Sequence, residues 1–413
     1  MTPDPHTPNA IDTQSAMQLA LNLAHQAIGL TEPNPRVGCV ITTAEGRLIG
    51  QGHTQQAGGA HAEVMALRDA QANGESVEGA VVHVTLEPCA HHGRTPPCCD
   101  ALIAAKVSEV IYALQDPNPS TAGKGAMRLQ AAGITATLLA PGDLATQAHE
   151  LNIGFFSRMQ RGRPWVRMKV AVSLDGRSAL NNGVSQWITS EAARADGHAW
   201  RKRASACLTG VGTVLDDNPR LDVRHVETAH QPLRVVVDSN LQTPLESRIL
   251  DAPGFALIYF ANDNAERRAA LQARGAGVQA VACSNGKVDL RAMLADLGNR
   301  GINELHVEAG SKLNGSFIRE ALVDEFLIYM APMLMGSGRE LAALGALENL
   351  DAAWRLRWHS VMPIGEDLRL LLRPLLQPPL QPPSQPLLQP LLQPPLQPRL
   401  QSQLSKLSQP HSG

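Results

Sequence analysis

The sequence lacks long apolar runs and an excess of charge of one sign, and it has few aromatic side chains. None of its hydrophobic stretches approaches the eighteen residues that a membrane-spanning helix needs, so we expect no membrane partner. The formal net charge is −2, and only 3% of the residues are aromatic. Because no basic stripe is present either, we do not expect a nucleic-acid partner.

The first residues, "MTPDPHTPNAID", have neither the basic residues nor the apolar core of a secretory signal. We therefore expect a cytoplasmic protein, and disulfides are rare in that reducing compartment. Cysteines that cluster in such a protein favour metal binding or catalysis.

The length and the hydrophobic pattern indicate two domains. A chain of 413 residues exceeds one ordinary domain. Helical and strand-like patterns alternate between residues 15 and 160, and the alternation resumes from 164 to 373. Such alternation is typical of α/β layer folds. We predict domains at 15–160 and 164–373.

The two ends have a different composition. Residues 1–14 are polar and contain several prolines, and residues 374–413 repeat Leu, Gln and Pro. Proline at this density blocks helices and sheet ladders and favours polyproline II. We predict that both ends are disordered.

The stretch "TLEPCAHHGRTPPCC", residues 85–99, and the upstream "HAE", residues 61–63, indicate a metal site. A hydrolytic zinc needs three protein ligands, an open position for water and a nearby carboxylate that moves protons. His61, Cys89 and either Cys98 or Cys99 offer the ligands, and Glu63 offers the carboxylate. The order His, Glu, Pro-Cys, Cys is that of zinc deaminases, although their two cysteines are normally closer together.

A structural zinc site is the alternative. It would need a fourth protein ligand, and His91, His92 and Cys99 are candidates. Glu63 speaks against this interpretation, because a structural zinc has no use for a proton-transferring carboxylate.

Several motifs resemble a known family. "PNPRVGCVI", "HAEVMAL", "TLEPCAHHGRTPPCCDALI" and "QDPNPSTAGKG" are similar to the deaminase half of the bifunctional deaminase/reductase of riboflavin biosynthesis. "SLDGRSA", "SQWITS" and "DDNPRLDVR" are similar to its reductase half. The resemblance covers residues 15–373. It implies a cytidine-deaminase-like three-layer α/β/α domain followed by a dihydrofolate-reductase-like α/β domain.

The resemblance also implies the metal ligands and the first reaction. The ligands of Zn²⁺ would be His61, Cys89 and Cys98, with Glu63 as general acid and base and Cys99 as a bystander. The substrate would be 2,5-diamino-6-(5-phosphoribosylamino)pyrimidin-4(3H)-one, which loses its 2-amino group as ammonia. Asn34 is our candidate contact to the pyrimidine edge, with a turn asparagine as the equal alternative.

The second reaction implied is the reduction of the ribosyl group of 5-amino-6-(5-phosphoribosylamino)uracil to ribityl by NADPH. No complete GxGxxG follows a strand, but "HVEAGSKLNGSFI" places small residues where a helix begins, which lets a pyrophosphate approach the backbone amides. The resemblance places NADPH near Ala171, Trp187, Thr213, Asp217, Ser239, Gly310, Ser311, Lys312, Leu313, Asn314, Gly315 and Ser316.

The resemblance places the phosphoribosyl substrate near Ser185, Arg201, Leu221, Arg224 and Glu308. The two arginines suit a phosphate and the other polar groups suit hydroxyls. For Asp175 and Lys169, the sequence leaves two alternatives, a role in the site and a purely structural role. We expect small-molecule substrates and a homo-oligomer. A deaminase of free or nucleic-acid bases with an unrelated second domain is the competing hypothesis.

Overall fold

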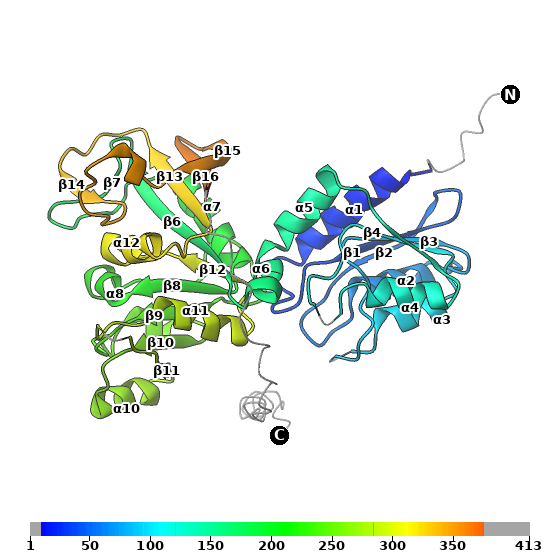
Figure 1. The fold of residues 1–413 in the computed structure, drawn as a ribbon, viewed down its shortest axis with the longest axis horizontal. Helices are drawn as coiled ribbons and strands as arrows, with labels where there is room; N and C mark the ends of the chain where they lie inside the picture. The colour runs from blue at the N-terminus through cyan, green and yellow to red at the C-terminus, as the bar shows by residue number, and fades with distance from the viewer. Residues whose placement is uncertain (1–9, 94, 120, 284, 376–413) are drawn as a thin grey trace, which may run out of the picture. The chain divides into compact units, whose positions relative to one another are not determined.

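The computed structural model describes residues 10–93, 95–119, 121–283 and 285–375 (Figure 1). They belong to one compact unit that contains two large, separate β-sheets. We call the elements α1 to α6 with the first sheet the N-terminal region, and the elements β6 to β16 the C-terminal region.

The N-terminal region is a five-stranded sheet between two layers of helices. Its order is β2-β1-β3-β4-β5; β1 is antiparallel to its two neighbours, and β3, β4 and β5 are parallel. The strands are β1 (Gly38–Thr42), β2 (Leu48–His53), β3 (Val81–Val84), β4 (Glu109–Tyr112) and β5 (Thr135–Leu138). The helices are α1 (Thr13–Gln26), α2 (Ala62–Ala72), α3 (Cys98–Ala104), α4 (Lys124–Ala131), α5 (Asp143–Leu151) and α6 (Ile153–Arg161).

Two hydrophobic cores lie on the two faces of this sheet. Helices α1 and α5 pack on one face, around Met17, Val40 and Ile111, and α2, α3 and α4 pack on the other, around Ile41 and Leu102 (Figure 1). The alternating side chains of β1 therefore serve both cores. The predicted three-layer α/β/α arrangement is confirmed.

The C-terminal region is a nine-stranded sheet of order β11-β10-β9-β8-β12-β6-β13-β16-β15, in which only the pairings of β16 are antiparallel. Its strands are β6 (Trp165–Ser173), β8 (Ala206–Gly210), β9 (Leu233–Val237), β10 (Ala256–Phe260), β11 (Gly277–Ala280), β12 (Glu304–Val307), β13 (Glu325–Ala331), β15 (Leu356–Ile364) and β16 (Asp367–Pro374). A separate pair is formed by β7 (Arg177–Leu180) and β14 (Gly338–Glu340).

Helices again cover both faces. The helices are α7 (Glu191–Arg203), α8 (Val211–Asp217), α9 (Arg248–Asp251), α10 (Ala265–Ala273), α11 (Leu290–Asn299) and α12 (Ser311–Arg319), with a 3₁₀ turn at Leu350–Ala352. Residues of α11 and α12 form the largest core with β6, β12 and β13. Residues of α8, α9 and α10 pack on the opposite face of β8, β9 and β10. The predicted α/β class is thus confirmed for this half as well.

Buried charge joins the two regions. The Glu304 carboxylate on β12 accepts hydrogen bonds from Arg36 Nη1 at 2.7 Å, Arg167 Nη1 at 2.6 Å and Arg203 Nε at 2.9 Å. Burial opposes ionisation of Glu304, but the three guanidinium groups outweigh it and lower the pKa of its carboxyl below the ordinary value. A buried carboxylate is tolerated only with such partners.

The predicted ends differ from the structure by a few residues. Helix α1 begins at Thr13 because the Asp12 carboxylate caps it, accepting from the Ser15 amide at 2.7 Å. The prediction of disorder over 1–14 is therefore wrong for its last residues, and residues 1–9 lie outside the described ones. Pro374 ends β16, which corrects the start of the predicted tail; beyond Leu375 the tail is outside the described residues.

Helix α6 covers residues 153–161, at the end of the predicted first domain. Gly162 ends this helix with a φ of 67°, in the left-handed region that suits glycine. No helix in the described part of the chain combines the length and the apolar character needed to cross a bilayer.

We expect the Asp324→Asn variant to show a weaker acid dependence of stability than the wild type. Asp324 is buried, and although burial opposes its ionisation, Arg163 and Arg161 lower the pKa of its carboxyl below 3.8. A carboxyl with a lowered folded-state pKa stabilises the protein above its unfolded pKa, and this contribution is lost as the pH falls through the folded value. Urea unfolding at several values between about pH 3 and pH 7 measures the slope of the free energy of unfolding against pH. Equal slopes in the two proteins would contradict the role of this carboxylate.

Candidate metal centre and ligand cavity

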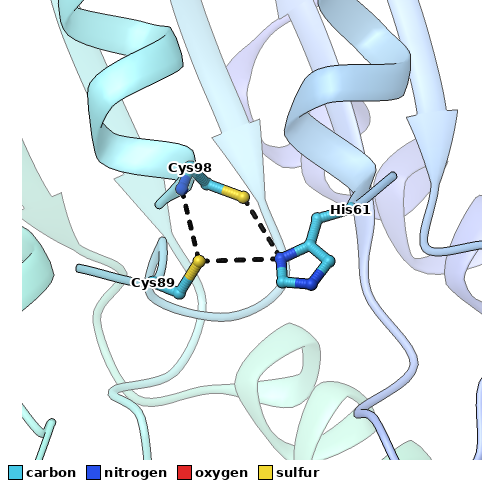
Figure 2. A group of neighbouring side chains, drawn as sticks. All are labelled: His61, Cys89 and Cys98. Carbon is cyan, nitrogen blue, oxygen red and sulfur yellow. Dashed lines mark hydrogen bonds between the residues drawn. The ribbon is translucent and has the colours of Figure 1, made fainter. Parts of the chain in front are cut away.

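Three side chains converge in the N-terminal region. Figure 2 shows His61, Cys89 and Cys98 pointing toward one another, and their ligand atoms all lie within 4.8 Å of one another. His61 Nδ1 lies 3.6 Å from Cys89 Sγ and 3.3 Å from Cys98 Sγ. A nitrogen and a sulfur on one tetrahedral zinc are about 3.6 Å apart, given bonds of about 2.1 and 2.3 Å. The donor set and its spacing therefore fit zinc.

The local structure explains why these residues meet. His61 is the N-cap residue of α2, and Cys98 is the first residue of α3, so both ligands lie at the N-terminal ends of helices. Cys89 follows β3 and receives the Cys98 amide on its sulfur at 3.3 Å. The other nitrogen of His61, Nε2, lies 3.4 Å from Thr95 Oγ1, a contact that orients the ring.

The two ligand thiols influence each other's ionisation. A hydrogen bond from Cys98 is the main cause that lowers the pKa of Cys89 to about 4, while the thiolate of Cys89 raises the pKa of Cys98. A thiolate is the form that ligates metal. A divalent cation at this point would favour loss of the second proton as well.

Glu63 lies on the first turn of α2 and is 4% exposed. Burial raises the pKa of its carboxyl to about 7, with Cys89 adding to the shift. A carboxyl that can either hold or release a proton near neutral pH is suited to general acid–base chemistry.

Cys99 is outside the triad. It is fully buried, and its thiol donates to the carbonyl oxygens of Pro88 and Gly125 at 3.4 and 3.6 Å. Among the described residues, the group of possible metal ligands contains neither His91, His92 nor Cys99. The geometry therefore offers three protein ligands, as a catalytic zinc requires, and does not offer the fourth that a structural zinc requires.

A cavity of about 240 Å³ opens next to the triad. Its lining includes His61, Glu63 and Cys89, and also Asn34, the predicted pyrimidine contact. Glu87 was missed from the sequence although it lies two residues before Cys89. Its carboxylate accepts hydrogen bonds from the amides of Asp116, Gly123 and Ala126 and so shapes the cavity wall.

A larger cavity of about 1550 Å³ lies in the C-terminal region. Of the predicted cofactor and substrate residues of this half, its lining contains all but two: Ala171, Ser185, Trp187, Arg201, Thr213, Asp217, Leu221, Arg224, Ser239, Glu308, Gly310, Ser311, Lys312, Leu313 and Ser316. The structure thus gathers into one cavity residues that span 146 positions of the sequence, from Ala171 to Ser316.

Asn314 and Gly315 do not line this cavity. Asn314 is buried and donates from its side chain to the Leu341 carbonyl at 2.9 Å. A Cβ on Gly315 would lie 2.2 Å from the Ala343 carbonyl oxygen. Five of the seven residues from 310 to 316 therefore line the cavity, because consecutive residues of a helix point in different directions.

The cavity is rich in positive charge. Its lining holds ten Lys and Arg residues against five Asp and Glu residues, which suits ligands that carry several phosphates. Helix α12 begins here at Ser311, and no side chain caps its first amides. These free amides fit a pyrophosphate.

Glu308 is paired at the end of β12. Arg201 donates to it from Nε at 2.5 Å and from Nη2 at 2.9 Å, and Lys169 Nζ lies 3.5 Å away. Burial opposes ionisation of Glu308, but Arg201 and Lys169 hold the pKa of its carboxyl well below the ordinary value. Arg201 directs both Nε and Nη2 to this carboxylate. Arg224 donates to Asp222 through Nη1 alone and is nearly half exposed, so it is the predicted arginine with nitrogens better placed for a phosphate.

Lys169 lies in the cavity wall, whereas Asp175 does not. The Asp175 carboxylate accepts from Ser173 Oγ at 2.5 Å and from the Met335 and Gly336 amides at 3.1 and 2.7 Å. These hydrogen bonds show that Asp175 stabilises the turn after β6. Cys283 is partly exposed at the cavity wall, whereas Cys39 and Cys207 are buried.

His198 of α7 is a cavity residue that the sequence did not single out. Its Nδ1 accepts the Arg224 amide at 3.2 Å. Burial, followed by Arg201 and Arg224, lowers its pKa to about 3, so the ring is neutral at physiological pH. No motif surrounds His198, and only the folded chain brings it beside Arg224.

Comparisons with known proteins match both halves of the chain. The model of the cytidine and deoxycytidylate deaminase zinc-binding region matches residues 11–114, and the model of the RibD C-terminal domain matches residues 164–370. The riboflavin biosynthesis protein RibD of Escherichia coli (strain K12) is 43% identical over 370 residues, which are 86% of this chain and 98% of that protein. RibD of Aquifex aeolicus (strain VF5) is 39% identical, over 86% and 97% of the two chains.

Solved structures show the same similarity. Acinetobacter baumannii RibD (form 1) has a TM-score of 0.79 and 39% identity, over 88% of this chain and 98% of that chain. A Thermotoga maritima structure, described as a diaminohydroxyphosphoribosylaminopyrimidine deaminase/5-amino-6-(5-phosphoribosylamino)uracil reductase, has a TM-score of 0.78 and 31% identity over the same shares. The cytidine-deaminase-like first half and the resemblance inferred from the motifs are confirmed. The chain belongs to the RibD family of bifunctional riboflavin-biosynthesis enzymes.

Proposed function

We propose that the chain deaminates 2,5-diamino-6-(5-phosphoribosylamino)pyrimidin-4(3H)-one at the metal centre and reduces 5-amino-6-(5-phosphoribosylamino)uracil with NADPH in the larger cavity. Residues 15–160 would perform the first step and residues 164–373 the second. The observation that carries the proposal is the triad of His61, Cys89 and Cys98 beside the buried Glu63, in one chain with a second, positively charged cavity.

His61, Cys89 and Cys98 would hold the zinc, which supplies the Lewis acid that activates water. Glu63 takes a proton from the attacking water and passes it to the departing amine, so that ammonia leaves as a neutral molecule. Asn34 offers the pyrimidine edge both a donor and an acceptor.

The residues of the larger cavity align the second substrate with the cofactor. NADPH would supply the hydride that opens the ribosyl ring at C1. The first amides of α12 would bind its pyrophosphate, and Ala171, Trp187, Thr213, Asp217 and Ser239 would line the rest of its site. Lys169 and Glu308 bind sugar hydroxyls, and Arg224 binds the substrate phosphate.

The proposal extends to compartment and assembly. The two ligand thiols must stay reduced, which favours the cytoplasm. Strand β15 forms an edge of its sheet and exposes Trp358, Val361 and Met362. An exposed apolar edge strand is a surface for pairing with another chain, so we propose a homo-oligomer that forms along β15.

The Glu63→Gln variant should keep its zinc and lose ammonia release by about 10²- to 10⁴-fold, because the amide preserves the shape but moves no proton. Metal analysis and an ammonia assay with the diaminopyrimidine substrate measure this. Reduction of directly supplied aminouracil substrate is the control and should be unchanged. Undiminished deamination would refute the role of Glu63.

The Arg224→Ala variant should raise the KM of the reduction about tenfold or more, the effect of losing one charge-assisted hydrogen bond. Deamination should stay within twofold of the wild type, by about the precision of such assays. The same two steady-state assays test it. An equal loss in both reactions would mean that the substitution damages the fold rather than a phosphate contact.

The Trp358→Glu/Val361→Glu variant should sediment as a smaller species than the wild type, because two charges on the edge strand oppose pairing. Analytical ultracentrifugation measures the masses. As the control, Leu174→Glu places a charge at an equally exposed apolar residue away from β15. A wild type that sediments as a monomer, or a variant with the same mass as an oligomeric wild type, contradicts assembly along β15.

A further inference from the structure

The segment 32–36, "EPNPR", both lines the small cavity of the N-terminal region and contacts the C-terminal region. Asn34 and Pro35 line the small cavity beside the metal triad. The side chains on either side of them, Glu32 and Arg36, instead contact the C-terminal region. The segment thus connects the deaminase cavity to the reductase sheet.

Asn303, directly before β12, holds the first part of the segment. Its Nδ2 donates to Glu32 Oε2 at 2.7 Å and to the Pro33 carbonyl at 3.0 Å. Ser205 Oγ also donates to Glu32 Oε2, at 2.8 Å. Asn303 is 3% exposed, so its side chain makes these hydrogen bonds from a buried position.

Glu304 holds the other end of the segment. Its carboxylate accepts from Arg36 Nη1 at 2.7 Å, and the Arg203 carbonyl accepts from Arg36 Nη2 at 2.6 Å. Arg36 is 3% exposed. On the N-terminal side, Asn152 accepts from the Arg36 amide at 2.7 Å and donates to its carbonyl at 2.9 Å.

Between these two anchors, Asn34 is held only through its backbone. Its amide donates to the Thr31 carbonyl at 2.9 Å, and its carbonyl accepts from Thr31 Oγ1 at 3.2 Å. Within the described residues, its side-chain amide makes no hydrogen bond, while Asn34 lines the cavity. The position of this amide therefore depends on the anchors at Glu32, Pro33 and Arg36.

We propose that Asn303 and Glu304 of the reductase region are positioning residues for deamination, which hold Asn34 at the pyrimidine. This inference rests on the proposed contact between Asn34 and the substrate. A buried ion pair stabilises a fold weakly compared with an apolar contact of the same size, but it specifies one geometry well. Such an ion pair is suited to fixing the position of a substrate-contacting residue without touching the substrate itself.

The test uses the full-length Asn303→Ala and Glu304→Gln variants. Each is assayed for zinc content, thermal unfolding, deamination and reduction of directly supplied aminouracil substrate. The expected result is a KM for the diaminopyrimidine raised at least fivefold, with full zinc content and unchanged reduction. Glu304→Gln deprives Arg36, Arg167 and Arg203 of a charged partner and can unfold the protein. In that case Asn303→Ala decides the outcome.

The matched control is Glu150→Gln. The Glu150 carboxylate accepts from Arg373 Nη1 at 2.8 Å and Nη2 at 2.5 Å, so a partly buried ion pair also joins the two regions here. Within the described residues, neither of these two side chains hydrogen-bonds to residues 32–36. This variant should leave the deamination KM unchanged. A similar rise in KM for Glu150→Gln, or no rise in a folded Asn303→Ala variant, overturns the inference.

Asn34→Ala separates this inference from the proposed function. If Asn34→Ala leaves the deamination KM unchanged, the substrate contact itself is refuted. If Asn34→Ala raises the KM but Asn303→Ala does not, the contact stands and the positioning role is refuted. If both raise it and Asn303 acts through Asn34, the double variant should be no worse than Asn34→Ala alone.

Discussion

The structure depends on one buried carboxylate. Glu304 begins the central strand β12 and contacts Arg36 of the N-terminal region together with Arg167 and Arg203 of its own region. Removing this charge from water is costly, and only a fixed arrangement of all three guanidinium groups offsets that cost. The arrangement sets how the deaminase elements contact the reductase sheet. Glu308, four residues after Glu304 and directly after the end of β12, lies in the reductase cavity. One short stretch of chain therefore contributes both to the contact between the regions and to the reductase cavity.

The two sites use charge in opposite ways. At the metal centre, burial raises the pKa of the Glu63 carboxyl to about 7. Its protonated and ionised forms are therefore both accessible near neutral pH. In the larger cavity, Arg201 and Lys169 keep Glu308 ionised in spite of burial. In the proposed mechanism the proton carrier Glu63 and the hydroxyl-binding Glu308 are both glutamates, and the partners around each one decide its behaviour. The two chemistries can therefore coexist in one chain at one pH.

The sequence predicted what depends on local pattern. The spacing of His61, Glu63, Cys89 and Cys98 reflects a helix start, a strand end and a second helix start, all visible as periodicity. The choice between Cys98 and Cys99 followed only from the family resemblance. The sequence did not reveal what depends on distant partners. Arg36 and Glu304 are 268 positions apart, and neither looks different from a surface charge until the chain is folded. For the same reason the orientation of Asn314, the pairing of Arg201 and the place of His198 in the cavity could not be predicted.

In the proposed function, one chain carries out two successive reactions on one molecule. The most direct measurement follows ammonia and NADPH together while the purified protein converts the diaminopyrimidine substrate. We expect ammonia to appear first and, at completion, one NADPH to have been oxidised for each ammonia released. Oxidation of NADPH without ammonia, or ammonia release that is never followed by NADPH oxidation, would contradict it.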